Sequence, residues 1–280
     1  MQAIMNFRRV ALAILFSTAA AAVLAQAQPA KKDAGFAPTV GQEGKDVVWV
    51  PTSQALVNRM LDMAKVTPSD YVIDLGSGDG RTVITAAKRG ARALGVEYNP
   101  EMVALSRRNA QKEGMGEKVQ FVQGDIFETD FSQATVITLF LLPELNVKLR
   151  PKILDMNPGT RVVSNSFTMG DWQADRTQNV TEKEGCTAYC TAYLWIVPAK
   201  VEGKWKTADG DLVLKQNFQT ITGSLGRDAK AGQIGKGTVR ADQITFTAGG
   251  AQYSGKVSGD TITGTVKSGE NSRPFTATRS

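Results

Sequence analysis

The sequence predicts an α/β domain built on a parallel sheet, followed by a small all-β domain. Up to residue 198, short apolar runs alternate with segments of helical periodicity, as expected for a parallel sheet with helices on both faces. From residue 204 onward, period-two runs are separated by glycines and polar turns. Of the 27 glycines, 13 lie after Lys200, whereas all 8 methionines and both cysteines lie before it. We therefore expect an α/β domain at residues 46–200 and a β domain at residues 203–280.

The N-terminus predicts a secretory signal. Arg8 and Arg9 precede an apolar run over residues 10–24, and Ala25-Gln26-Ala27 supplies the small residues that a signal peptidase reads, so cleavage is expected after Ala27. An uncleaved anchor is the alternative, but this alanine-rich run is shorter than the about 20 residues that a bilayer requires. Because the arginines come first, the mature chain is expected in the periplasm or secreted, without a transmembrane span.

Residues 28–45 are polar, contain prolines and glycines, and lack periodicity, so they predict a disordered linker.

The elements of the α/β domain follow in chain order. Residues 57–64 place apolar side chains on one helical face, and Pro68 ends that pattern. A strand at residues 71–75 runs into a glycine-rich turn, and the next helical pattern stops at Gly90. The same rhythm predicts strands at 93–96, 119–123, 135–139 and 161–164, with helices around 102–110 and 145–154.

In the β domain, the alternation predicts short antiparallel strands that close into a small barrel or sandwich. The formal net charge of the whole chain is +6, and residues 203–280 hold 11 Lys and Arg against 6 Asp and Glu. These charges are dispersed, which indicates a solvated surface and gives no specific nucleic-acid signal. The domain shows no catalytic constellation, so we expect it to bind a partner or position a substrate. Its strands are predicted at 212–214, 220–223, 237–239, 243–246, 253–257 and 261–266.

The chain contains no histidine. This excludes Ser-His-Asp and Cys-His catalysis, an imidazole proton shuttle and a histidine-ligated zinc. Catalysis must then use carboxylates, amines, hydroxyls, backbone dipoles or a cofactor that carries the reactivity itself.

A glycine-rich turn with two carboxylates follows the first predicted strand. Residues 74–80 read Asp-Leu-Gly-Ser-Gly-Asp-Gly. In open parallel sheets the ligand lies beyond the carboxyl ends of the strands, so these glycines let the backbone approach it. A dinucleotide fingerprint offers a helix N-terminus to a pyrophosphate, which Asp74 and Asp79 would repel. The turn therefore suits a cationic group better than a phosphate.

Two more carboxylates follow the next two strands. Glu97 comes 21 residues after Gly76, where a carboxylate can bind both hydroxyls of a ribose. Asp125 follows the third strand and can accept a hydrogen bond from an adenine amino group. Each residue alone is explained as well by a helix cap or a turn. Three such residues at successive strand ends predict a nucleoside site.

These residues resemble a known family. Residues 72–80, Glu97 and Gly124-Asp125 are similar to the motifs of class I S-adenosylmethionine-dependent methyltransferases. More narrowly, Val50-Pro51-Thr52, residues 74–81 and Leu142-Pro143 resemble the mitochondrial protein-lysine methyltransferases that modify the c-ring protein of ATP synthase and the adenine nucleotide carrier. The resemblance covers about residues 46–198 and implies a Rossmann-like methyltransferase fold with S-adenosylmethionine as cofactor.

The resemblance also implies roles for individual residues. The glycine turn would cradle the methionine portion and Asp74 its ammonium group, while Glu97 would bind the ribose. Asp125 would hold the adenine, and Thr52 would close over the cofactor. The expected cofactor-binding residues are Thr52, Asp74, Gly76, Ser77, Gly78, Asp79, Gly80, Glu97, Tyr98, Asp125 and Ile126.

The methyl acceptor is left open. The Asn/Asp-Pro-Pro-Tyr/Phe motif of many amino-group methyltransferases is absent, and residues 140–144, Phe-Leu-Leu-Pro-Glu, stand in its place. The narrower resemblance implies a protein lysine, whose amine must be neutral to react and is made so by a desolvated pocket. Glu144 is the catalytic candidate for orienting or deprotonating it. The alternative for Glu144 is a carboxylate favoured by a helix N-terminus.

Cys186 and Cys190 are the only two cysteines. An oxidising compartment favours a disulfide, which requires a turn between them because an extended strand would keep them apart. Free thiols are the alternative. The C-x-x-x-C spacing alone makes a poor zinc site, and no metal site is predicted.

Two functional hypotheses follow. The first is an exported S-adenosylmethionine-dependent methyltransferase, in which the cofactor brings the methyl group and the protein aligns the acceptor. The second is an exported non-catalytic protein that keeps the fold as a nucleoside-binding or envelope adaptor protein.

Overall fold

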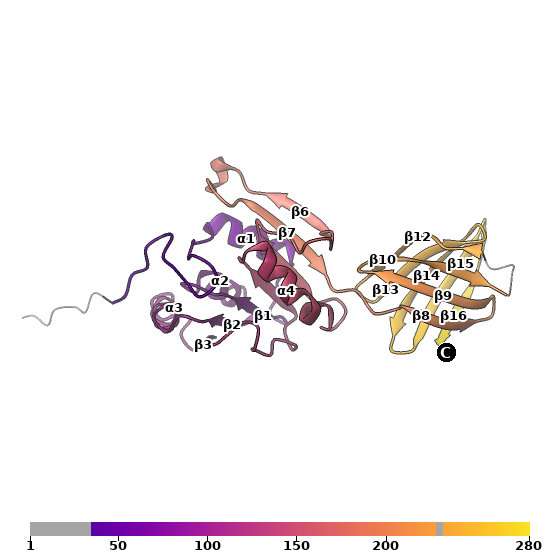
Figure 1. Ribbon diagram of the computed structural model, residues 1–280, viewed down its shortest axis with the longest axis horizontal. Coiled ribbons are helices and arrows are strands. Elements are labelled where there is room, and N and C mark those ends of the chain that lie inside the picture. Colours follow the sequence, from indigo (N-terminus) through magenta and orange to yellow (C-terminus); the bar gives the residue numbers. More distant parts are fainter. Residues whose placement is uncertain (1–34, 228–231) are drawn as a thin grey trace, which may run out of the picture. The chain divides into compact units, whose positions relative to one another are not determined.

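The computed structural model describes residues 35–227 and 232–280. Within these residues the strands form a seven-stranded sheet and a nine-stranded sheet (Figure 1). The change from one sheet to the other falls between Ile196 and Gly203. The predicted signal peptide and residues 28–34 of the predicted linker lie outside the described residues. Among the described helices, none has the length and apolarity to cross a membrane.

The seven-stranded sheet has the order β3-β2-β1-β4-β5-β7-β6. The five strands from β3 to β5 run parallel, as predicted. Strand β7 is antiparallel to β5, and β6 is antiparallel to β7, so the sheet is mixed at one edge, where two strands lie that were not predicted. The strands are β1 (Tyr71–Leu75), β2 (Arg92–Glu97), β3 (Val119–Gln123), β4 (Val136–Leu139), β5 (Arg161–Asn165), β6 (Arg176–Asn179) and β7 (Thr191–Ile196).

The antiparallel edge has a physical reason. The connection between β6 and β7 holds only the 3-10 turn η1 (Glu182–Glu184) and an irregular loop, which is too short for the crossover that a parallel pair requires. Strand β6 reads Arg-Thr-Gln-Asn and is mostly exposed, so it lacks the apolar run that identified the other strands.

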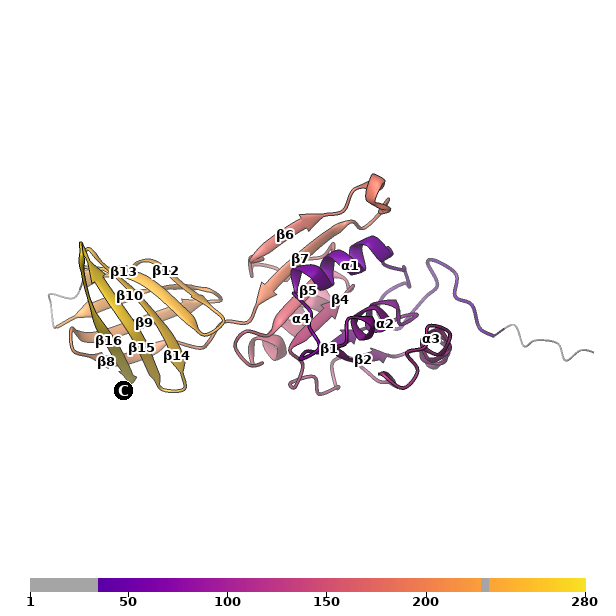
Figure 2. The ribbon, with the colours of Figure 1, turned by 180° about the vertical axis from the view of Figure 1, so that it is seen from behind.

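Helices cover both faces of this sheet (Figures 1 and 2). Helices α1 (Gln54–Met63), α2 (Arg81–Lys88) and α3 (Pro100–Lys112) pack with one side of the strands, to which Val72 belongs. Helix α4 (Pro143–Leu154) packs with the other side, to which Ile73 belongs. The alternation along β1 therefore divides the core into two layers. Helix α1 begins earlier than predicted because Ser53 caps it, accepting from the Leu56 amide.

The nine-stranded sheet closes into a barrel (Figure 2). Strand β9 pairs with β10, so that among the described residues eight strands form a closed ring, and the short β11 pairs antiparallel with the end of β10. Of the two architectures predicted, the structure has the barrel, and its interior is filled by apolar side chains that include Trp205, Phe246 and Phe275. The strands are β8 (Gly203–Thr207), β9 (Gly210–Asn217), β10 (Thr220–Gly226), β11 (Gly232–Gln233), β12 (Gly235–Arg240), β13 (Gln243–Ala248), β14 (Ala251–Ser258), β15 (Thr261–Ser268) and β16 (Asn271–Arg279).

Strand β16 was not predicted because Pro274 interrupts its pattern. In the structure, β16 pairs with β15 along its length but with β8 only at residues 277–279. At Pro274, β16 therefore has a strand partner on one side only, namely β15. A proline, which has no amide hydrogen, is tolerated at such an edge position.

Cys186 and Cys190 form a disulfide. Their Cα atoms lie 5.7 Å apart because the chain turns between them, as the pairing required. Gly185 and Tyr189 have positive φ angles of 94° and 54°, which produce this turn. The loop from residue 186 to residue 190 is called the disulfide loop below.

Candidate active site

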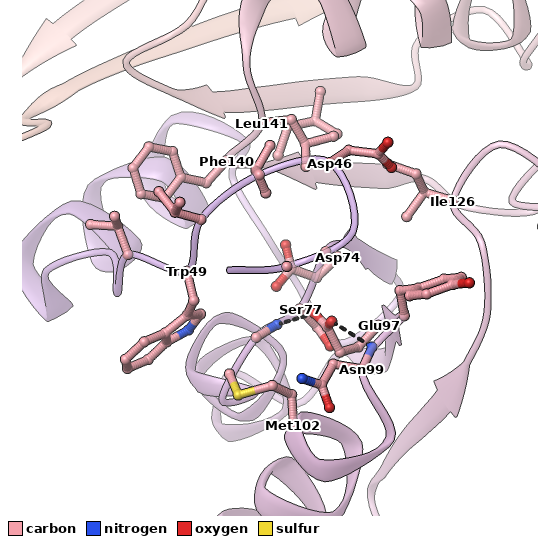
Figure 3. A pocket seen from close by; sticks show the side chains of 18 of the residues that line it. Asp46, Trp49, Asp74, Ser77, Glu97, Asn99, Met102, Ile126, Phe140 and Leu141 are labelled. Atoms are coloured by element: carbon pink, nitrogen blue, oxygen red, sulfur yellow. Dashed lines mark hydrogen bonds between the residues drawn. The ribbon is translucent and has the colours of Figure 1, made fainter. Parts of the chain in front are cut away.

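A cavity of about 510 Å³ lies at the carboxyl ends of the parallel strands (Figure 3). Its size is typical of a site for a small molecule. The residues that line it come from the ends of β1 to β5, from the disulfide loop, from residues 42–52 of the segment before α1, and from the four helices of the α/β domain. We call residues 41–52 the strap. Except for Gly80, every cofactor-binding residue predicted from the sequence lines this cavity.

Asp74 lies on β1 and is buried. It accepts a hydrogen bond from the Thr138 hydroxyl of the neighbouring strand β4. Burial raises the pKa of Asp74 to about 7; the negative charges of Glu97 and Asp79 act in the same direction, and the Thr138 bond opposes them. Among the described residues, no Lys or Arg side chain pairs with Asp74. The site thus holds a buried carboxylate that a bound cation would stabilise.

The turn after β1 requires glycine. Gly78 has a φ of 54°, and a Cβ there would lie 2.8 Å from Nε1 of Trp49 in the strap. Gly80, with a φ of 82°, begins α2, and a Cβ there would lie 2.7 Å from the Phe121 ring. Gly80 is therefore a structural residue of the turn and does not line the cavity. Gly76 and Ser77 donate their amides to the Val96 carbonyl, which fixes the turn against β2.

Glu97, at the end of β2, joins two turns. Its Oε2 accepts a hydrogen bond of 2.9 Å from the Gly78 amide, and its Oε1 accepts one of 3.0 Å from the Asn99 amide (Figure 3). Each carboxylate oxygen can accept a second hydrogen bond, so Glu97 keeps acceptor capacity for a pair of hydroxyls.

Asp79 lines the cavity and also holds an arginine. Its carboxylate pairs with Arg81 at 2.5 Å, and Nη1 of Arg81 donates to the Thr52 carbonyl at 2.7 Å. Asp79 thus orients an arginine that holds the end of the strap. Thr52 is buried, and its hydroxyl accepts from the side-chain amide of Asn165 at 3.1 Å.

Asp125, after β3, is tied to the strap. Its Oδ2 lies 2.5 Å from Nζ of Lys45, and its Oδ1 accepts from the Phe127 amide at 2.8 Å. The hydrogen bond from Lys45 is the largest cause that lowers the pKa of Asp125, so the carboxylate is ionised at neutral pH. The same ammonium lies 4.9 Å from the ring centroid of Tyr98, which is half exposed. Ile126 also lines the cavity here. We call the ends of β1, β2 and β3 the carboxylate side.

The strap differs from the disordered linker predicted for residues 28–45. Residues 43 and 48 form an antiparallel bridge, the Trp49 amide donates to the Gln42 carbonyl at 2.8 Å, and the Gly41 amide donates to the Trp49 carbonyl at 2.9 Å. Residues 41–45 are thus part of a small hairpin over the cavity, where Lys45 and Trp49 contact the α/β domain (Figure 3). A polar composition without periodicity does not reveal such a contact.

The catalytic prediction for Glu144 is corrected. Glu144 is exposed in the first turn of α4 and does not line the cavity, which Leu142 and Leu145 contact on either side of it. The turn of the helix directs residues 142 and 145 inward and residue 144 outward. A carboxylate in this position is favoured by the helix dipole, which was the alternative interpretation.

Four aromatic residues of the cavity were not predicted, namely Trp49 of the strap and three that lie together. Phe140 follows β4, Phe167 follows β5, and Tyr189 belongs to the disulfide loop. Their ring centroids lie 5.3 to 6.1 Å apart, so they form one continuous surface, which we call the aromatic wall. The position of Phe140 and Phe167 just after predicted strands was a usable signal. Nothing in the sequence pattern pointed to Tyr189.

The chain is similar to known methyltransferases. The family described as ANTKMT methyltransferase domain matches residues 74–176. The protein-lysine N-methyltransferase of Saccharolobus islandicus (strain REY15A) is 42% identical over 154 residues, which make up 54% of this chain and 94% of that protein. The adenine nucleotide translocase lysine N-methyltransferase of Mus musculus is 34% identical over 129 residues, covering 45% of this chain and 56% of that relative, so the chain spans about half of its length.

A solved structure supports the same fold. The RNA methyltransferase from Salinibacter ruber, in complex with S-adenosyl-L-homocysteine, is 48% identical, with a TM-score of 0.50. The match covers 54% of this chain and 96% of that one. S-Adenosylhomocysteine is what remains of S-adenosylmethionine after the methyl group has left, so the cofactor of the fold is S-adenosylmethionine. With nearly the whole of the Saccharolobus enzyme matched, this chain belongs to the protein-lysine N-methyltransferase family of class I S-adenosylmethionine-dependent methyltransferases.

Proposed function

We propose that this enzyme transfers a methyl group from S-adenosylmethionine to a lysine amine of a protein outside the cytoplasm. The observation that carries the proposal is the buried carboxylate of Asp74, which has no cationic partner among the described residues. A methylated sulfonium cofactor with an α-ammonium group supplies the missing positive charge.

The residues of the carboxylate side fit the three parts of the cofactor. Asp74 and the backbone of Gly76 and Gly78 hold the methionine portion. Glu97, fixed by the amides of Gly78 and Asn99, accepts from the ribose hydroxyls. Ile126, Tyr98 and Asp125, which line the cavity after β2 and β3, would hold the adenine, and Thr52 of the strap would cover the cofactor.

In methyl transfer the main task of the protein is to position the two reactants. When bound, S-adenosylmethionine supplies an electrophilic methyl group on its sulfur. The chain's own residues orient the acceptor for in-line attack and exclude water, with the strap and the leucines after β4 closing the cavity. Because Glu144 points outward, we assign the neutral state of the acceptor amine to desolvation, which lowers the pKa of an amine from its usual value near 10.4.

The lysine acceptor is supported by the names of the relatives. The enzymes from Saccharolobus islandicus and Mus musculus are both called lysine N-methyltransferases. The Salinibacter ruber protein is called an RNA methyltransferase, which makes RNA the second candidate acceptor. The dispersed charges of this chain do not favour RNA.

The extracytoplasmic location is supported by two features. The first 27 residues have the layout of a secretory signal, and the only two cysteines form a disulfide, a bond that persists in oxidising compartments. Terminal sequencing of the protein from a cell-envelope fraction tests this part: an N-terminus at Gln28 supports export, whereas an intact N-terminus in the cytoplasmic fraction refutes it.

The cofactor site is tested by calorimetric titration of the mature protein with S-adenosylmethionine. Asp74→Asn keeps the shape of the side chain and removes its charge, so we expect a dissociation constant about 10- to 100-fold higher, given that hydrogen bonds to charged groups contribute about 1.5 to 3 kcal/mol each. Asp130→Asn, at an exposed site away from the cavity, is the matched control. Equal affinity of both variants refutes the role of Asp74.

The acceptor is identified by methyl transfer from labelled cofactor into an envelope extract. Label that protease removes and that co-migrates with methyl-lysine after acid hydrolysis supports the proposal. Label that ribonuclease removes supports the RNA alternative instead.

A further inference from the structure

The aromatic wall and the carboxylate side line the cavity from different strands. All three rings of the wall line the cavity. The Tyr189 ring meets the Phe140 ring edge-on at 5.3 Å, and the Phe140 and Phe167 rings are stacked at 6.1 Å. Tyr189 remains 47% exposed, so the wall reaches from the interior of the cavity to its mouth.

The charges of the cavity lie away from this wall. Among the described lining residues, those from the ends of β4 and β5, the start of α4 and the disulfide loop are leucines and aromatic residues without charge. The lining carboxylates come from the strap and from the carboxylate side. A ligand group on the aromatic wall is therefore bound by ring faces in a poorly hydrated place, and not by an ion pair.

Ring faces of this kind attract alkylammonium groups. A cation within about 6 Å of a ring centroid is stabilised by the ring quadrupole, more strongly where water is excluded. The flexible chain of a lysine also buries its methylenes against apolar surface while its head group stays at the polar end. The ring faces attract the ammonium form as the lysine arrives, whereas desolvation opposes its charge and so favours the neutral amine that must attack the methyl group.

Two rings of the wall are fixed by the packed domain. Phe140 follows directly from β4, which is buried along its whole length. Phe167 is held through Asn146 of α4, whose side-chain amide donates to the carbonyls of Phe167 at 3.3 Å and of Thr168 at 3.2 Å. These contacts keep both rings in place without help from the disulfide loop.

The third ring depends on the disulfide. Tyr189 is a non-glycine residue with a φ of 54°, a conformation that is unfavourable for such residues and persists only where its surroundings impose it. The constraint here is the five-residue ring closed by Cys186 and Cys190, in which Cys186 is buried against the core. Opening that ring frees Tyr189 to leave the wall.

We propose that Phe140, Phe167 and Tyr189 form the subsite for the alkylammonium end of the acceptor lysine, and that the Cys186–Cys190 disulfide completes this subsite by holding Tyr189. Acceptor binding then depends on the disulfide, whereas cofactor binding does not. The inference rests on the proposed function, because it takes lysine as the acceptor.

The test separates the two ligands. With the mature protein saturated with S-adenosylhomocysteine, the probe Nα-acetyl-lysine methylamide is titrated and ring-proton shifts are followed by NMR. The norleucine analogue, which has the same methylenes but no amine, is the matched ligand. Affinity for S-adenosylmethionine is measured in parallel by calorimetry.

We expect Tyr189→Ala and the double variant Cys186→Ser, Cys190→Ser to weaken binding of the lysine probe about fivefold to tenfold. Tyr189→Phe keeps the ring and binds as the wild type does. Lys183→Ala, at an exposed position of η1 outside the cavity, is the control for the segment. All four are expected to bind S-adenosylmethionine within about twofold of the wild type.

Reduction provides a check without substitution. Added dithiothreitol gives two electrons and two protons to the sulfur pair, so that two thiols form and the reagent closes to its own disulfide. Circular dichroism confirms that the fold is retained, and the lysine probe is expected to bind as weakly as it does to the double serine variant.

The outcomes are distinguishable. Unchanged probe affinity in Tyr189→Ala, or in the reduced protein, overturns the inference, and so does equal binding of the lysine and norleucine probes. If the wild-type protein does not bind S-adenosylmethionine at all, the proposed function itself is refuted. Cofactor binding without any binding of the lysine probe overturns the subsite while leaving the cofactor site intact.

Discussion

The carboxylate side and the aromatic wall are two halves of one cavity that are built in opposite ways. The carboxylate side is polar, and the Glu97 carboxylate links two of its turns through backbone amides. The aromatic wall is apolar and joins three connections that are far apart in the chain, one of them closed by a disulfide. The difference suggests a division of labour, in which one half binds a constant cofactor and the other sets what is methylated.

The sharpest test of this division is Glu97→Ala. It removes the acceptor for the ribose hydroxyls and the partner of the Gly78 and Asn99 amides. We expect the dissociation constant for S-adenosylmethionine to rise about 10- to 100-fold, because hydrogen bonds to a charged group contribute about 1.5 to 3 kcal/mol. Calorimetry measures this change, and methyl-transfer kinetics at saturating cofactor measure the acceptor KM.

The acceptor KM is expected to stay within about twofold of the wild type in Glu97→Ala. Glu101→Ala removes an exposed carboxylate from the first turn of α3, outside the cavity, and serves as the control. A rise in acceptor KM as large as the loss of cofactor affinity would show that the two halves do not act separately.

The carboxylate side could be predicted from the sequence better than the aromatic wall, because of how each half of the cavity is built. Asp74, Gly76 and Gly78 lie within one short motif after one strand, so spacing alone brought them together. Glu97 and Asp125 were found because parallel strands end at the same edge of a sheet. The roles were harder to predict than the positions, since the pairing of Asp79 with Arg81 and of Asp125 with Lys45 depends on the strap.

The position of Tyr189 in the aromatic wall was beyond sequence reasoning for a physical reason. Its ring is placed by a positive φ angle and a disulfide that form only when the loop folds. Glu144 was assigned to the cavity because it stands in the place of a known motif, but the direction of a side chain in the first turn of a helix depends on how that helix packs. Barrel closure likewise depends on the pairing of β9 with β10, which the period-two pattern leaves open.

The pH dependence of cofactor binding gives a second test, confined to the carboxylate side. The pKa of Asp74 is raised to about 7 in the protein without ligand, and only the ionised carboxylate attracts a cation. Affinity for S-adenosylmethionine is therefore expected to fall by about tenfold from pH 8 to pH 6, since each unit below the pKa reduces the ionised fraction by about tenfold.

Asp74→Asn is expected to bind weakly at both pH values and to lose this dependence. The folded state keeps a proton on Asp74 up to about pH 7, whereas the unfolded state releases it near pH 4. The stability of the protein without ligand therefore falls as the pH rises from about 4 to about 7, and the full cost of ionising Asp74 remains above pH 7. The variant should therefore unfold at a higher temperature than the wild type at pH 8. A wild-type affinity that does not change between pH 6 and pH 8 would contradict the assignment of Asp74.

The smallest expected effect belongs to the strap, which crosses the cavity next to the carboxylate side. Lys45 joins the strap to Asp125 and lies over the Tyr98 ring, but this ion pair is partly solvated, and such pairs contribute little. The strap keeps its other contacts, since Arg81 still holds the Thr52 carbonyl and Trp49 still packs on Gly78. We expect Lys45→Ala to raise the dissociation rate of S-adenosylmethionine about two- to threefold in stopped-flow measurements, with the acceptor KM unchanged.

The direction of the change in dissociation rate distinguishes two roles for Lys45, because Lys45 and the adenine amino group would both donate to Asp125. If Lys45 mainly fastens the strap, its removal speeds cofactor release. Added salt then raises the dissociation rate of the wild type toward that of the variant. If it mainly competes with adenine for Asp125, its removal slows release. Lys88→Ala, which breaks the exposed pair between Lys88 and Glu113 away from the cavity, should change neither rate. Slower release in Lys45→Ala would refute the role of Lys45 in fastening the strap. It would show instead that Lys45 competes with the adenine amino group for Asp125.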